Sequence, residues 1–568
     1  MSVLELCRKQ GIPVPTLCYH PMLEPVGKCR LCLVEIDKSG KLVPSCVTPL
    51  KNGMKIETNT ERIRKTVKTN IELLLSSHPH ECTTCESGDR CELQKLAYMY
   101  DAKGKFPANP KEENKSDQEE AVDKSSPSLV RDMNKCILCG RCVRACSALQ
   151  GMNILGIAGR GDTSVPETLF NSPLNTTDCI NCGQCSFYCP VGAITENSSV
   201  KEVNDLLHDK KQKVVVFQTA PATRVAISEE FGFEPGTIST GRLVTALKRL
   251  GADYVFDTNF TADLTIMEEG SELLDRIKNN GVLPMFTSCC PAWINLVEQS
   301  YPELIPNLSS ARSPQGMLSS LIKRYWAKKK QIHEKNVVVI SVMPCTAKKD
   351  EAKRKQLTLD DGSQETDYVL TTRELGKLIK LNSISFASLP ETPHDNPLGE
   401  STGAAVIFAN TGGVMEAALR TAYELGTGKP LPTLDFQPVR GFTAIKEADI
   451  DFNGIQLKVA VVHGAVNIHE YIKKMKAGLF KHHFVEFMVC KGGCIGGGGE
   501  PKSISDDYLL KRMQGVYKID NILGVRKSHE NPSVQALYKD FLQKPLSHTS
   551  HKLLHTHYED RKKKNEKK

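Results

Sequence analysis

Cysteine is the residue through which this chain can do the most chemistry. Of its 568 residues, 21 are cysteine, and most of them stand in Cys-x-x-Cys spacing. In a chain of this size, such spacing favours metal ligation over disulfides. Because a thiolate binds iron only while it stays reduced, we expect the protein to work in a reducing, anaerobic compartment.

Two adjacent cysteines, Cys289 and Cys290, form the most unusual pair in the sequence. Consecutive side chains point apart on a regular backbone, so one metal centre rarely takes both. We interpret one as a metal ligand and the other as a free thiol, against the alternative that both are small buried apolar residues. Three cysteines from two later loops, Cys345, Cys490 and Cys494, complete a set of four thiolates with Cys290.

The first cysteine group has the spacing Cys-x10-Cys-x2-Cys-x13-Cys and consists of Cys18, Cys29, Cys32 and Cys46. A tight loop runs into residues 33–36, which alternate in polarity as a strand does. Four thiolates in this arrangement suit a plant-type 2Fe-2S cluster, with a zinc site as the alternative.

A second group has three cysteines and needs a fourth ligand. Cys82, Cys85 and Cys91 share one short loop with no other cysteine nearby, and His78 and His80 precede them. A histidine in such a loop is more often polar surface. As a ligand, a neutral imidazole in place of a charged thiolate tends to raise the potential of a cluster.

The third group is a run of four cysteines that occurs twice. Each run has the spacing Cys-x2-Cys-x2-Cys-x3-Cys of bacterial two-cluster ferredoxins, in which the fourth cysteine of each run binds the other cluster. We therefore predict two 4Fe-4S clusters that carry electrons and offer no open site for substrate. The first has the ligands Cys136, Cys139, Cys142 and Cys189, and the second has Cys179, Cys182, Cys185 and Cys146.

These groups use nineteen of the cysteines and leave Cys7 and Cys289. Cys7 fits no cluster, and we expect it to be a packed thiol. Cys289 then remains as the free thiol beside the four-ligand set.

From about residue 211 the sequence changes to apolar runs that alternate with helical stretches. Such runs are typical of parallel strands buried on both faces, which predicts an α/β domain. Ligands bind at the carboxyl ends of such strands, where residues 343–346 and 463–465 fall. The predicted strands are residues 214–217, 337–342, 404–408 and 459–462, and the predicted helix is residues 263–276.

Several stretches together carry a specific resemblance to a known family. Residues 285–293, 342–349 and 486–499 look like the three signature motifs of iron-only (FeFe) hydrogenases. Residues 411–419 and 526–531 extend the similarity over essentially the whole chain. The domain order is similar to that of the monomeric clostridial enzymes.

The resemblance implies an H-cluster, which is a 4Fe-4S cube joined to a diiron unit that carries CO, cyanide and an azadithiolate. It implies that Cys494 bridges the two parts and that Lys348 donates to a cyanide. Backbone around Ala220-Pro221 is expected to do the same, and the family often has serine where this chain has Ala222. Glycines 496–499 would let the backbone approach the cofactor. The cube ligands implied are Cys290, Cys345, Cys490 and Cys494, and the apolar lining implied is Met343, Phe408 and Met488, with ordinary core packing as the alternative.

The predicted helix carries a charged stripe, because Glu269, Glu272 and Arg276 share one face. A charged stripe is usually a solvated face. The resemblance instead implies a proton relay in which Cys289 takes the proton from the bridge amine and passes it through water to Glu269. From there the proton goes through Ser309 to Glu272 and Arg276, and transfer depends on matched pKa values.

The N-terminal groups resemble modules shared by these hydrogenases and the large iron-sulfur subunit of respiratory complex I. The resemblance selects His78 as the fourth ligand and implies a β-grasp fold for the 2Fe-2S module. Residues 3–7 already look like the helix of that module. We therefore expect that its first hairpin is absent, as in a fragment or a trimmed form.

The expected fold is multidomain, α+β and α/β. Residues 1–75 form the β-grasp 2Fe-2S domain, and residues 76–112 form the one-His/three-Cys 4Fe-4S module. A polar linker at residues 113–130 leads to a two-4Fe-4S ferredoxin domain at residues 131–205. Residues 206–568 form a large α/β H-cluster domain with parallel sheets, a helical extension and a basic tail.

The expected function is a ferredoxin hydrogenase that catalyses 2H⁺ + 2e⁻ ⇌ H₂ at the H-cluster. The cofactors are one 2Fe-2S cluster, three accessory 4Fe-4S clusters and the H-cluster. The partners are a small acidic ferredoxin and maturation proteins for the diiron unit. Alternatives are an iron-sulfur assembly factor of the prelamin-recognition type, a sensory or bifurcating hydrogenase, and a complex I-type subunit that fits only about the first 110 residues.

Charge and hydropathy bear on the possible partners and location of the protein. The net charge is +8, but much of the excess lies in residues 561–568, which we interpret as a solvated end and not as a nucleic-acid site. No apolar run approaches the roughly 20 residues that span a membrane. The first residues lack the pattern of a signal peptide. We expect a soluble protein of the cytoplasm or, in a eukaryote, of the hydrogenosome matrix.

Overall fold

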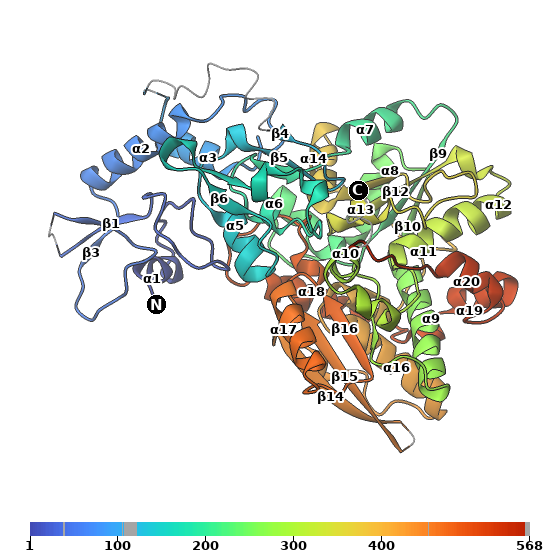
Figure 1. The fold of residues 1–568 in the computed structure, drawn as a ribbon. Helices are drawn as coiled ribbons and strands as arrows, with labels where there is room; N and C mark the ends of the chain where they lie inside the picture. Colours follow the sequence, from blue (N-terminus) through green and yellow to red (C-terminus); the bar gives the residue numbers. More distant parts are fainter. Residues whose placement is uncertain (38–39, 105, 107–121, 453, 563–568) are drawn as a thin grey trace. The chain divides into compact units, whose positions relative to one another are not determined.

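The computed structural model describes residues 1–37, 40–104, 106, 122–452 and 454–562. The chain divides into two compact units, each with its own core. The first comprises Met1–Thr177, Gln184–Asn197 and Ile504–Asp506. The second comprises Asp178–Gly183, Ser198–Ser503 and Asp507–Lys568. Figure 1 follows the chain through their helices and strands.

The first unit begins with helix α1 (Val3–Lys9), whose N-terminus carries a capping box between Ser2 and Glu5. The helix packs against the antiparallel sheet β2–β1–β3, made of Leu42–Pro44, Leu33–Ile36 and Ile56–Glu57. Cys7 is buried between Val3 and Val34. The predicted helix, strand and packed thiol are therefore confirmed.

Helices α2 (Glu61–Ser76) and α3 (Glu92–Met99) follow, and then a ferredoxin-like part. Buried Arg141 connects the N-terminal part with α3 and the ferredoxin-like part. Its guanidinium donates to the Tyr19 carbonyl, the Glu92 carboxylate and the Tyr188 carbonyl, respectively. The ferredoxin-like part consists of β4 (Val122–Asp123), β5 (Leu129–Asp132), α5 (Arg141–Arg144), β6 (Gly156–Ala158), β7 (Val165–Glu167), α6 (Gln184–Tyr188) and β8 (Ile194–Glu196).

The two four-cysteine runs share a local backbone geometry. In each run, the residue before the second cysteine and the glycine after it have positive φ: 55° at Leu138 and 69° at Gly140, 58° at Asn181 and 70° at Gly183. The left-handed backbone turns the chain tightly between the cysteines, which is costly for Leu138 and easier for asparagine and glycine. The repeat predicted from spacing is thus also a repeat of conformation.

The second unit contains two four-stranded sheets. One has the order β10–β9–β12–β13 (Tyr254–Asp257, Val214–Thr219, Val337–Met343, Tyr368–Thr371), and all its neighbours are parallel. The other has the order β11–β16–β15–β14 (Met285–Phe286, Phe484–Met488, Ile455–His463, Ile445–Phe452), in which β14 runs antiparallel to β15. The Val-rich and Ile-rich strands are buried on both faces, as parallel sheets require.

Helices cover both faces of the parallel sheet. Helices α7 (Val200–His208), α8 (Thr240–Leu250) and α14 (Thr372–Leu381) form one apolar core with it. Helices α9 (Thr258–Lys278) and α11 (Pro314–Leu321) form the other core together with α19 (Pro532–Leu537) and α20 (His548–Leu554). Helices α16 (Gly413–Thr427) and α17 (Ala465–Lys476) pack against the mixed sheet (Figure 1). The remaining helices are α10 (Pro291–Ser300), α12 (Ala327–Lys329), α13 (Ala347–Glu351), α15 (Gly403–Val406) and α18 (Tyr508–Ile522).

One predicted strand is wrong. Residues 404–408 form helix α15 and the 3₁₀ turn η13 (Ile407–Ala409). The Thr402 side chain accepts a hydrogen bond from the Ala405 N–H and so caps the helix. The run is apolar on all sides because α15 packs among α9, α16 and α18.

Other boundaries also differ from the sequence-based expectation. The predicted helix 263–276 lies within the longer α9, and the predicted strands 214–217, 337–342 and 459–462 lie within β9, β12 and β15. The expected linker 113–130 includes β4 and the start of β5, and its residues up to 121 lie outside the described part. The basic tail beyond residue 562 does so too.

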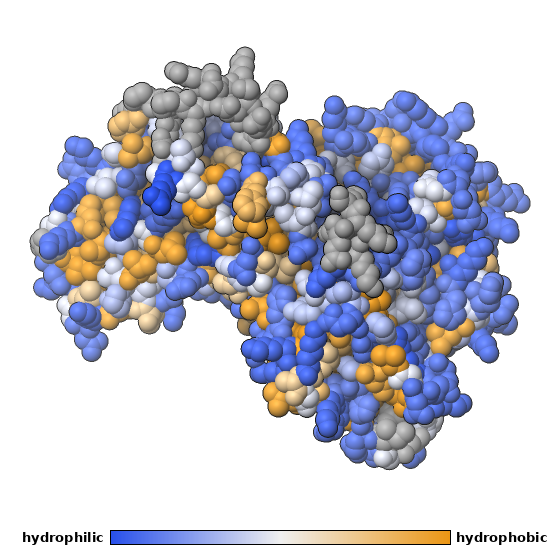
Figure 2. Space-filling model, viewed as in Figure 1, coloured by the Kyte–Doolittle hydropathy of each residue, from blue (hydrophilic) through white to orange (hydrophobic). Residues whose placement is uncertain are grey.

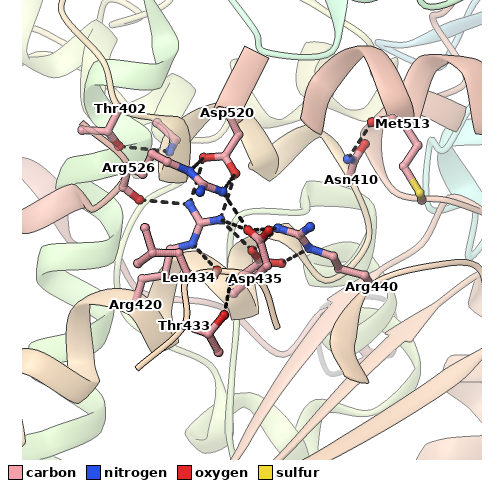
Figure 3. A network of polar contacts seen from close by, with 12 residues as sticks. Thr402, Asn410, Arg420, Thr433, Leu434, Asp435, Arg440, Met513, Asp520 and Arg526 are labelled. Atoms are coloured by element: carbon pink, nitrogen blue, oxygen red, sulfur yellow. Dashed lines mark hydrogen bonds and ion pairs between the residues drawn. The ribbon is translucent and has the colours of Figure 1, made fainter. Parts of the chain in front are cut away.

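A cluster of six charges around the fully buried Glu416, Arg420 and Asp520 holds α18 and the segment after it in place within the second unit (Figure 3). Arg420 donates to Glu416 and to both oxygens of Asp520, and Arg526 also donates to Asp520. Arg440 donates to Glu416 and Asp435. Three guanidinium groups thus neutralise three carboxylates, so these acids serve as ion pairs and not as a cation site.

Figure 2 shows the hydropathy of one face of the described residues. Hydrophilic residues dominate the face drawn in Figure 2, and its apolar residues form small separate patches. None of the helices in the described part is both long and apolar enough to cross a bilayer.

Candidate active site and metal centres

Four loops of the second unit meet at one place because each follows the carboxyl end of a parallel strand. Ala220 and Pro221 follow β9, and Cys345 follows β12. Cys289 and Cys290 follow β11, and the loop from Cys490 to Cys494 follows β16. This is the edge at which open α/β sheets bind ligands.

The four loops enclose a cavity of about 90 Å³ whose surface is almost entirely apolar. All four cysteines of the predicted cube set line it, and so do Cys289 and Lys348. The predicted apolar residues line it as well, and they come from four different elements. They are Ala220, Pro221, Met343, Phe408 and Met488.

The cysteines of the cavity suit a metal cluster, because without metal their thiols would stay protonated. Burial raises the pKa of Cys345 to about 12, and the neighbouring Cys290 contributes. Burial also raises the pKa of Cys494, with Cys290 and Cys345 adding to the effect. Several thiolates in one apolar cavity repel each other unless cations compensate their charge, which cluster iron does.

Cys290 is held by the start of a helix. It is the N-cap of α10, with Pro291 at the first helical position. The segment before it is fixed to β16, because the Thr287 hydroxyl accepts from the Phe487 N–H. The Trp293 indole N–H in turn donates to the Thr287 carbonyl at 3.1 Å. The sharp turn between strand and helix separates the two adjacent cysteine side chains.

Three polar side chains line the apolar cavity, those of Thr258, Gln315 and Lys348. Lys348 Nζ donates to the Cys289 carbonyl at 3.3 Å and to Glu351 Oε2 at 2.7 Å. Gln315 Nε2 also donates to Glu351, whereas Gln315 Oε1 is buried and accepts no hydrogen bond from the described residues. The cavity therefore offers a cationic donor and a spare acceptor to a polar group of a cofactor, so the residues fit an H-cluster.

The expected donation from backbone around Ala220-Pro221 stays a prediction, and these two residues themselves offer no N–H for it. The Ala220 N–H donates to the Val342 carbonyl within the sheet, and proline has no N–H. These two residues can only line the cavity. Ala222 is fully buried, and the neighbouring Thr223 hydroxyl donates to the Ala220 carbonyl, so it does not replace the serine that the family often has.

The glycine run has a different role from the expected one. Of its four glycines, only Gly497 lines the cavity. A Cβ on Gly497 would lie 2.2 Å from the Pro344 carbonyl oxygen, and a Cβ on Gly498 would lie 2.2 Å from the Cys182 carbonyl oxygen. The glycines mainly let backbone pack against backbone, which closes the loops around the cavity.

The charged stripe of α9 faces the protein interior and not water. Glu269 is fully buried, and its Oε1 accepts from the N–H and the hydroxyl of Ser288. Burial raises the pKa of Glu269 to about 7, with nearby Glu272 adding to the effect. Its Oε2 has no hydrogen-bond donor among the described residues. A carboxyl group with such a pKa can accept and release protons at neutral pH.

The next relay residues are joined directly. The Ser309 hydroxyl donates to Glu272 Oε2 at 2.8 Å, and Arg276 Nη2 donates to Glu272 Oε1 at 2.7 Å. Arg276 also donates to the carbonyls of Pro306 and Leu308, which fix its position. At Cys289, burial raises the pKa of the thiol well above its usual value, and Glu269 adds to the effect. The structure thus joins Ser309, Glu272 and Arg276 directly, and the steps from Cys289 to Glu269 and from Glu269 to Ser309 stay predictions.

The sequence-based prediction missed two residues of this site. Ser288 holds Glu269, although it adjoins Cys289 in the sequence. Glu351 pairs with Lys348, three residues before it on the same helix. The i,i+3 spacing of Lys348 and Glu351 was a signal that could have revealed this pair.

Sequence models of known families match this chain in several segments. The model described as "Iron only hydrogenase large subunit, C-terminal domain" matches residues 213–498, which is half of the chain. The chain belongs to the iron-only hydrogenase family. Its hydrogenase domain continues into a match to "Iron hydrogenase small subunit" at residues 506–561. The other matches are "2Fe-2S iron-sulfur cluster binding domain" at 1–61, "NADH-ubiquinone oxidoreductase-G iron-sulfur binding region" at 68–104 and "NADH-quinone oxidoreductase subunit 3, ferredoxin-like domain" at 126–195.

Relatives in the family match nearly the full length. The NADP-reducing hydrogenase subunit HndD of Solidesulfovibrio fructosivorans is 44% identical, with 98% of this chain and 96% of the relative covered. Iron hydrogenase 1 of Clostridium pasteurianum is 39% identical, with 98% and 97% covered. The structure of a variant of the [FeFe]-hydrogenase HydA1 from Chlamydomonas reinhardtii has 46% identity and a TM-score of 0.59, and covers 64% of this chain and 99% of its own. This iron-only hydrogenase therefore combines an H-cluster domain with 2Fe-2S and 4Fe-4S domains.

The first cysteine group of this hydrogenase is mostly buried, with Cys29 half-buried. The thiols of Cys18 and Cys29 are neighbours, and so are the thiols of Cys32 and Cys46. In each pair the second proton is lost less easily than the first, because two thiolates side by side repel each other. The pKa values of Cys29 and Cys46 therefore lie far above their usual range, mainly because of the neighbouring thiol. Metal would relieve this repulsion, so the group fits a 2Fe-2S cluster.

The two candidate histidines differ in environment. His78 is buried, and its Nδ1 has no hydrogen-bond partner among the described residues, whereas His80 is exposed. Burial lowers the pKa of His78 to about 4, so the ring is neutral, as a metal ligand must be. The resemblance selects His78 over His80, and this environment favours His78 as well.

The first ferredoxin-type set is assembled as the spacing predicts. Cys136, Cys139, Cys142 and Cys189 line one small cavity, so the fourth ligand comes from the second run. Of the other set, Cys146 and Cys185 belong to the first unit, and Cys179 and Cys182 belong to the second. That second set stays a prediction.

Proposed function

We propose that this hydrogenase interconverts H₂ with protons and electrons at an H-cluster in the apolar cavity, with ferredoxin as its electron partner. One observation carries the proposal. A free thiol, Cys289, and a set of four cysteines line the same cavity, and a buried carboxyl group with a pKa of about 7 lies next to it. Electron transfer needs the cysteine set, whereas proton transfer needs the thiol and the carboxyl group.

The residues have separate tasks in this proposal. Cys290, Cys345, Cys490 and Cys494 would hold the H-cluster, which supplies an iron site for H₂ and hydride chemistry. Lys348 orients a negative ligand of the cofactor. Met343, Phe408 and Met488 exclude water, which strengthens these electrostatic interactions.

Protons follow a chain of side chains. Cys289 exchanges a proton with Glu269 through water at the free Oε2, and Ser288 holds the other oxygen in place. Ser309 then connects this carboxyl group to Glu272, because it donates to Glu272 and contributes to the electrostatics of Glu269. Arg276 keeps Glu272 in position at the end of the chain.

Electrons would travel through one 2Fe-2S cluster and three 4Fe-4S clusters. Residues 1–75 carry twelve Lys and Arg residues against seven Asp and Glu residues. Lys28 and Arg30 are exposed on both sides of half-buried Cys29. A positive surface at a half-buried cluster ligand suits an acidic ferredoxin.

An infrared spectrum tests the proposed cofactor. The chain is produced anaerobically together with maturation proteins for the diiron unit, and a sample produced without them is the control. We expect bands of metal-bound CO and cyanide in the first sample only, and H₂ formation with a reduced dye. A spectrum without these bands in the matured protein would sink the proposal.

A charge substitution tests the ferredoxin partner. Lys28→Gln with Arg30→Gln should lower kcat/KM for ferredoxin by about threefold to tenfold at low salt and leave the rate with a small dye unchanged. Exposed Lys552 in α20 provides a charge-matched control, Lys552→Gln, which should not change either rate. Equal losses with ferredoxin and dye would argue against docking at this surface.

A second function deserves a direct comparison, because one relative is an NADP-reducing hydrogenase subunit. In that case, a further subunit would pass electrons between this chain and NADP. H₂-dependent NADP⁺ reduction should then require added partner subunits. Fast turnover with ferredoxin alone favours the first proposal, and turnover only with the added subunits favours the second.

A further inference from the structure

A second hydrogen-bonded chain leaves the relay at Glu272. The Ser310 hydroxyl lies 3.3 Å from Glu272 Oε2 and 2.8 Å from His555 Nδ1. His555 Nε2 lies 3.0 Å from Glu268 Oε2. The chain therefore runs from Glu272 through Ser310 and His555 to Glu268, in the opposite direction from Cys289.

Backbone pairing holds His555 in this place, although it lies far along the sequence. Residues 310–312 run beside residues 554–556, where the Arg312 N–H donates to the Leu554 carbonyl and the Thr556 N–H to the Ser310 carbonyl. Arg312 Nε also donates to the His555 carbonyl at 2.9 Å. The imidazole is buried, with 6% of the residue exposed, and its position is fixed on both sides.

Glu268 determines which ring nitrogen carries the hydrogen. This fully buried carboxylate accepts from the Tyr538 hydroxyl at 2.6 Å and from the Leu546 N–H at 2.9 Å. Its remaining neighbour, His555 Nε2, must then donate as N–H. In the neutral ring Nδ1 is therefore an acceptor, and it points at the Ser310 hydroxyl. A carboxylate, an imidazole and a hydroxyl thus stand in line, and the carboxylate stabilises a protonated ring.

We propose that His555 is a positioning residue that stores a proton for the relay by way of Ser310. In the transfer, the O–H bond of protonated Glu272 breaks as Ser310 Oγ gains that proton. The original O–H bond of Ser310 breaks as its proton binds His555 Nδ1. One proton moves in total, which leaves Glu272 as a carboxylate and His555 as an imidazolium, and the reverse transfer returns the proton. This inference rests on the proposed function, because it needs the relay to Cys289.

The surrounding charges favour both products of the transfer. Arg276 stabilises the Glu272 carboxylate once the proton has left, and Glu268 stabilises the imidazolium that it creates. Histidine is the side chain suited to hold a proton near neutral pH. The titratable and charged groups that face His555 are Glu268 and Glu272 from α9, Arg312 from the paired segment, Tyr538 from η17 (Tyr538–Leu542) and His551 from α20.

His555→Gln tests the proposal, because glutamine keeps hydrogen-bonding capacity and cannot store a proton. We expect H₂ evolution with a reduced dye to fall by about threefold to tenfold at pH 7.5, which is less than the roughly 10²–10⁴-fold of a direct acid-base group. At pH 6 the loss should be below about twofold, because hydronium is then abundant enough to protonate Glu272 directly. Exposed His551, whose ring centre lies 4.3 Å from that of His555, gives the matched control His551→Gln. The control should stay within about twofold of the unsubstituted protein at both pH values.

An infrared measurement on protein without the diiron unit provides a second readout. Between pH 6 and 8 the unsubstituted protein should show imidazole bands that change together with carboxylate bands, and ¹⁵N-labelled histidine should shift the former. His555→Gln should lose these coupled changes and His551→Gln should keep them. Thermal unfolding followed by tryptophan fluorescence checks that the variant is folded.

Two outcomes would overturn the proposal. One is a pH profile of His555→Gln parallel to that of the unsubstituted protein, and the other is persistence of the coupled infrared changes. If the unsubstituted protein evolves no H₂ at all, the proposed function fails, and the infrared measurement still decides whether His555 stores a proton.

Discussion

The two units of this hydrogenase hold cysteine in opposite ways. In the first unit most cysteines are separated from the next one by only two to thirteen residues. In the second unit the four ligands of the cavity come from loops up to two hundred residues apart, between Cys290 and Cys494. Large apolar cores cover both faces of the parallel sheet in this unit.

This difference in ligand spacing follows from the task of each unit, which is electron transfer in the first and H₂ chemistry in the second. A cluster that only passes electrons needs four nearby ligands and short distances, so local sequence can build it. A site that forms H₂ must also admit protons and exclude water. That task requires buried acids such as Glu269 and an apolar cavity, which only long-range packing provides. Four substitutions test this difference between the units.

The largest expected effect is that of Cys289→Ala. The first proton acceptor is lost, so H₂ evolution should fall by about 10²–10⁴-fold, while the CO and cyanide bands remain. The matched control is Cys7→Ala, which removes the buried free thiol of the first unit and should leave turnover intact. Loss of the infrared bands in Cys289→Ala would instead assign this cysteine to cofactor binding.

Arg420→Met should destabilise the second unit by about 3–5 kcal/mol, because buried Glu416 and Asp520 each lose one of two guanidinium partners and two arginines then face three carboxylates. Both tryptophans, Trp293 and Trp326, lie in this unit, so their fluorescence reports its unfolding. The paramagnetic resonance signals of the first unit should persist. The surface control Lys511→Met should leave the temperature of the fluorescence transition unchanged. If Arg420→Met unfolded both units together, their cores would not be independent.

Glu269→Gln should remove a pH dependence of stability. The folded pKa of about 7 lies above the usual value of 4.5, so the folded state binds the proton more tightly than the unfolded state. In the unsubstituted protein, the free energy of unfolding should therefore fall by about 3 kcal/mol as pH rises from about 4.5 to 7.

Tryptophan fluorescence at several pH values measures this slope. Glu269→Gln should flatten it, whereas a control at the exposed Glu234, Glu234→Gln, should retain it. An unchanged slope in Glu269→Gln would mean that this carboxyl group is ionised throughout.

The smallest expected effect is in the first unit. Arg144 donates to the carbonyls of Cys18 and Cys139, which belong to two different predicted clusters. Arg144→Gln removes a positive charge and both donors, so the potentials of both clusters should fall by roughly 20–60 mV. Redox titration followed by paramagnetic resonance measures the shift. The control Lys28→Gln removes one water-exposed charge beside Cys29 and should shift the 2Fe-2S potential less than Arg144→Gln does. If Arg144→Gln changed the potential of only one cluster, Arg144 would not act on both clusters.

The sequence predicted most reliably what depends on neighbouring residues. Cysteine spacing predicted the set of Cys136, Cys139, Cys142 and Cys189 that lines one cavity. It also predicted a packed Cys7. These results depend on short turns, for which spacing largely determines geometry. The strand predicted at residues 404–408 was wrong, because a short apolar run does not distinguish a buried strand from a buried helix.

Long-range pairings were beyond sequence reasoning. Ser310 and His555 are 245 residues apart, and no motif connects them. The resemblance supplied the relay through Glu269 and Ser309 but not Ser288, which holds the first carboxyl group. Which backbone N–H groups are already used in a sheet, as at Ala220, follows only from the three-dimensional structure.

The origin of the cavity from four strand ends has a consequence for biosynthesis. Ribosomes release the chain from the N-terminus, and all ligands of the accessory clusters have been made once residue 189 is complete. The cavity lacks a wall until Cys490 and Cys494 have been synthesised and β16 has joined its sheet. The cysteine and histidine ligands of the accessory clusters are therefore complete early in translation, whereas the cavity for the diiron unit cannot close before residue 494 has been made and the second unit has folded.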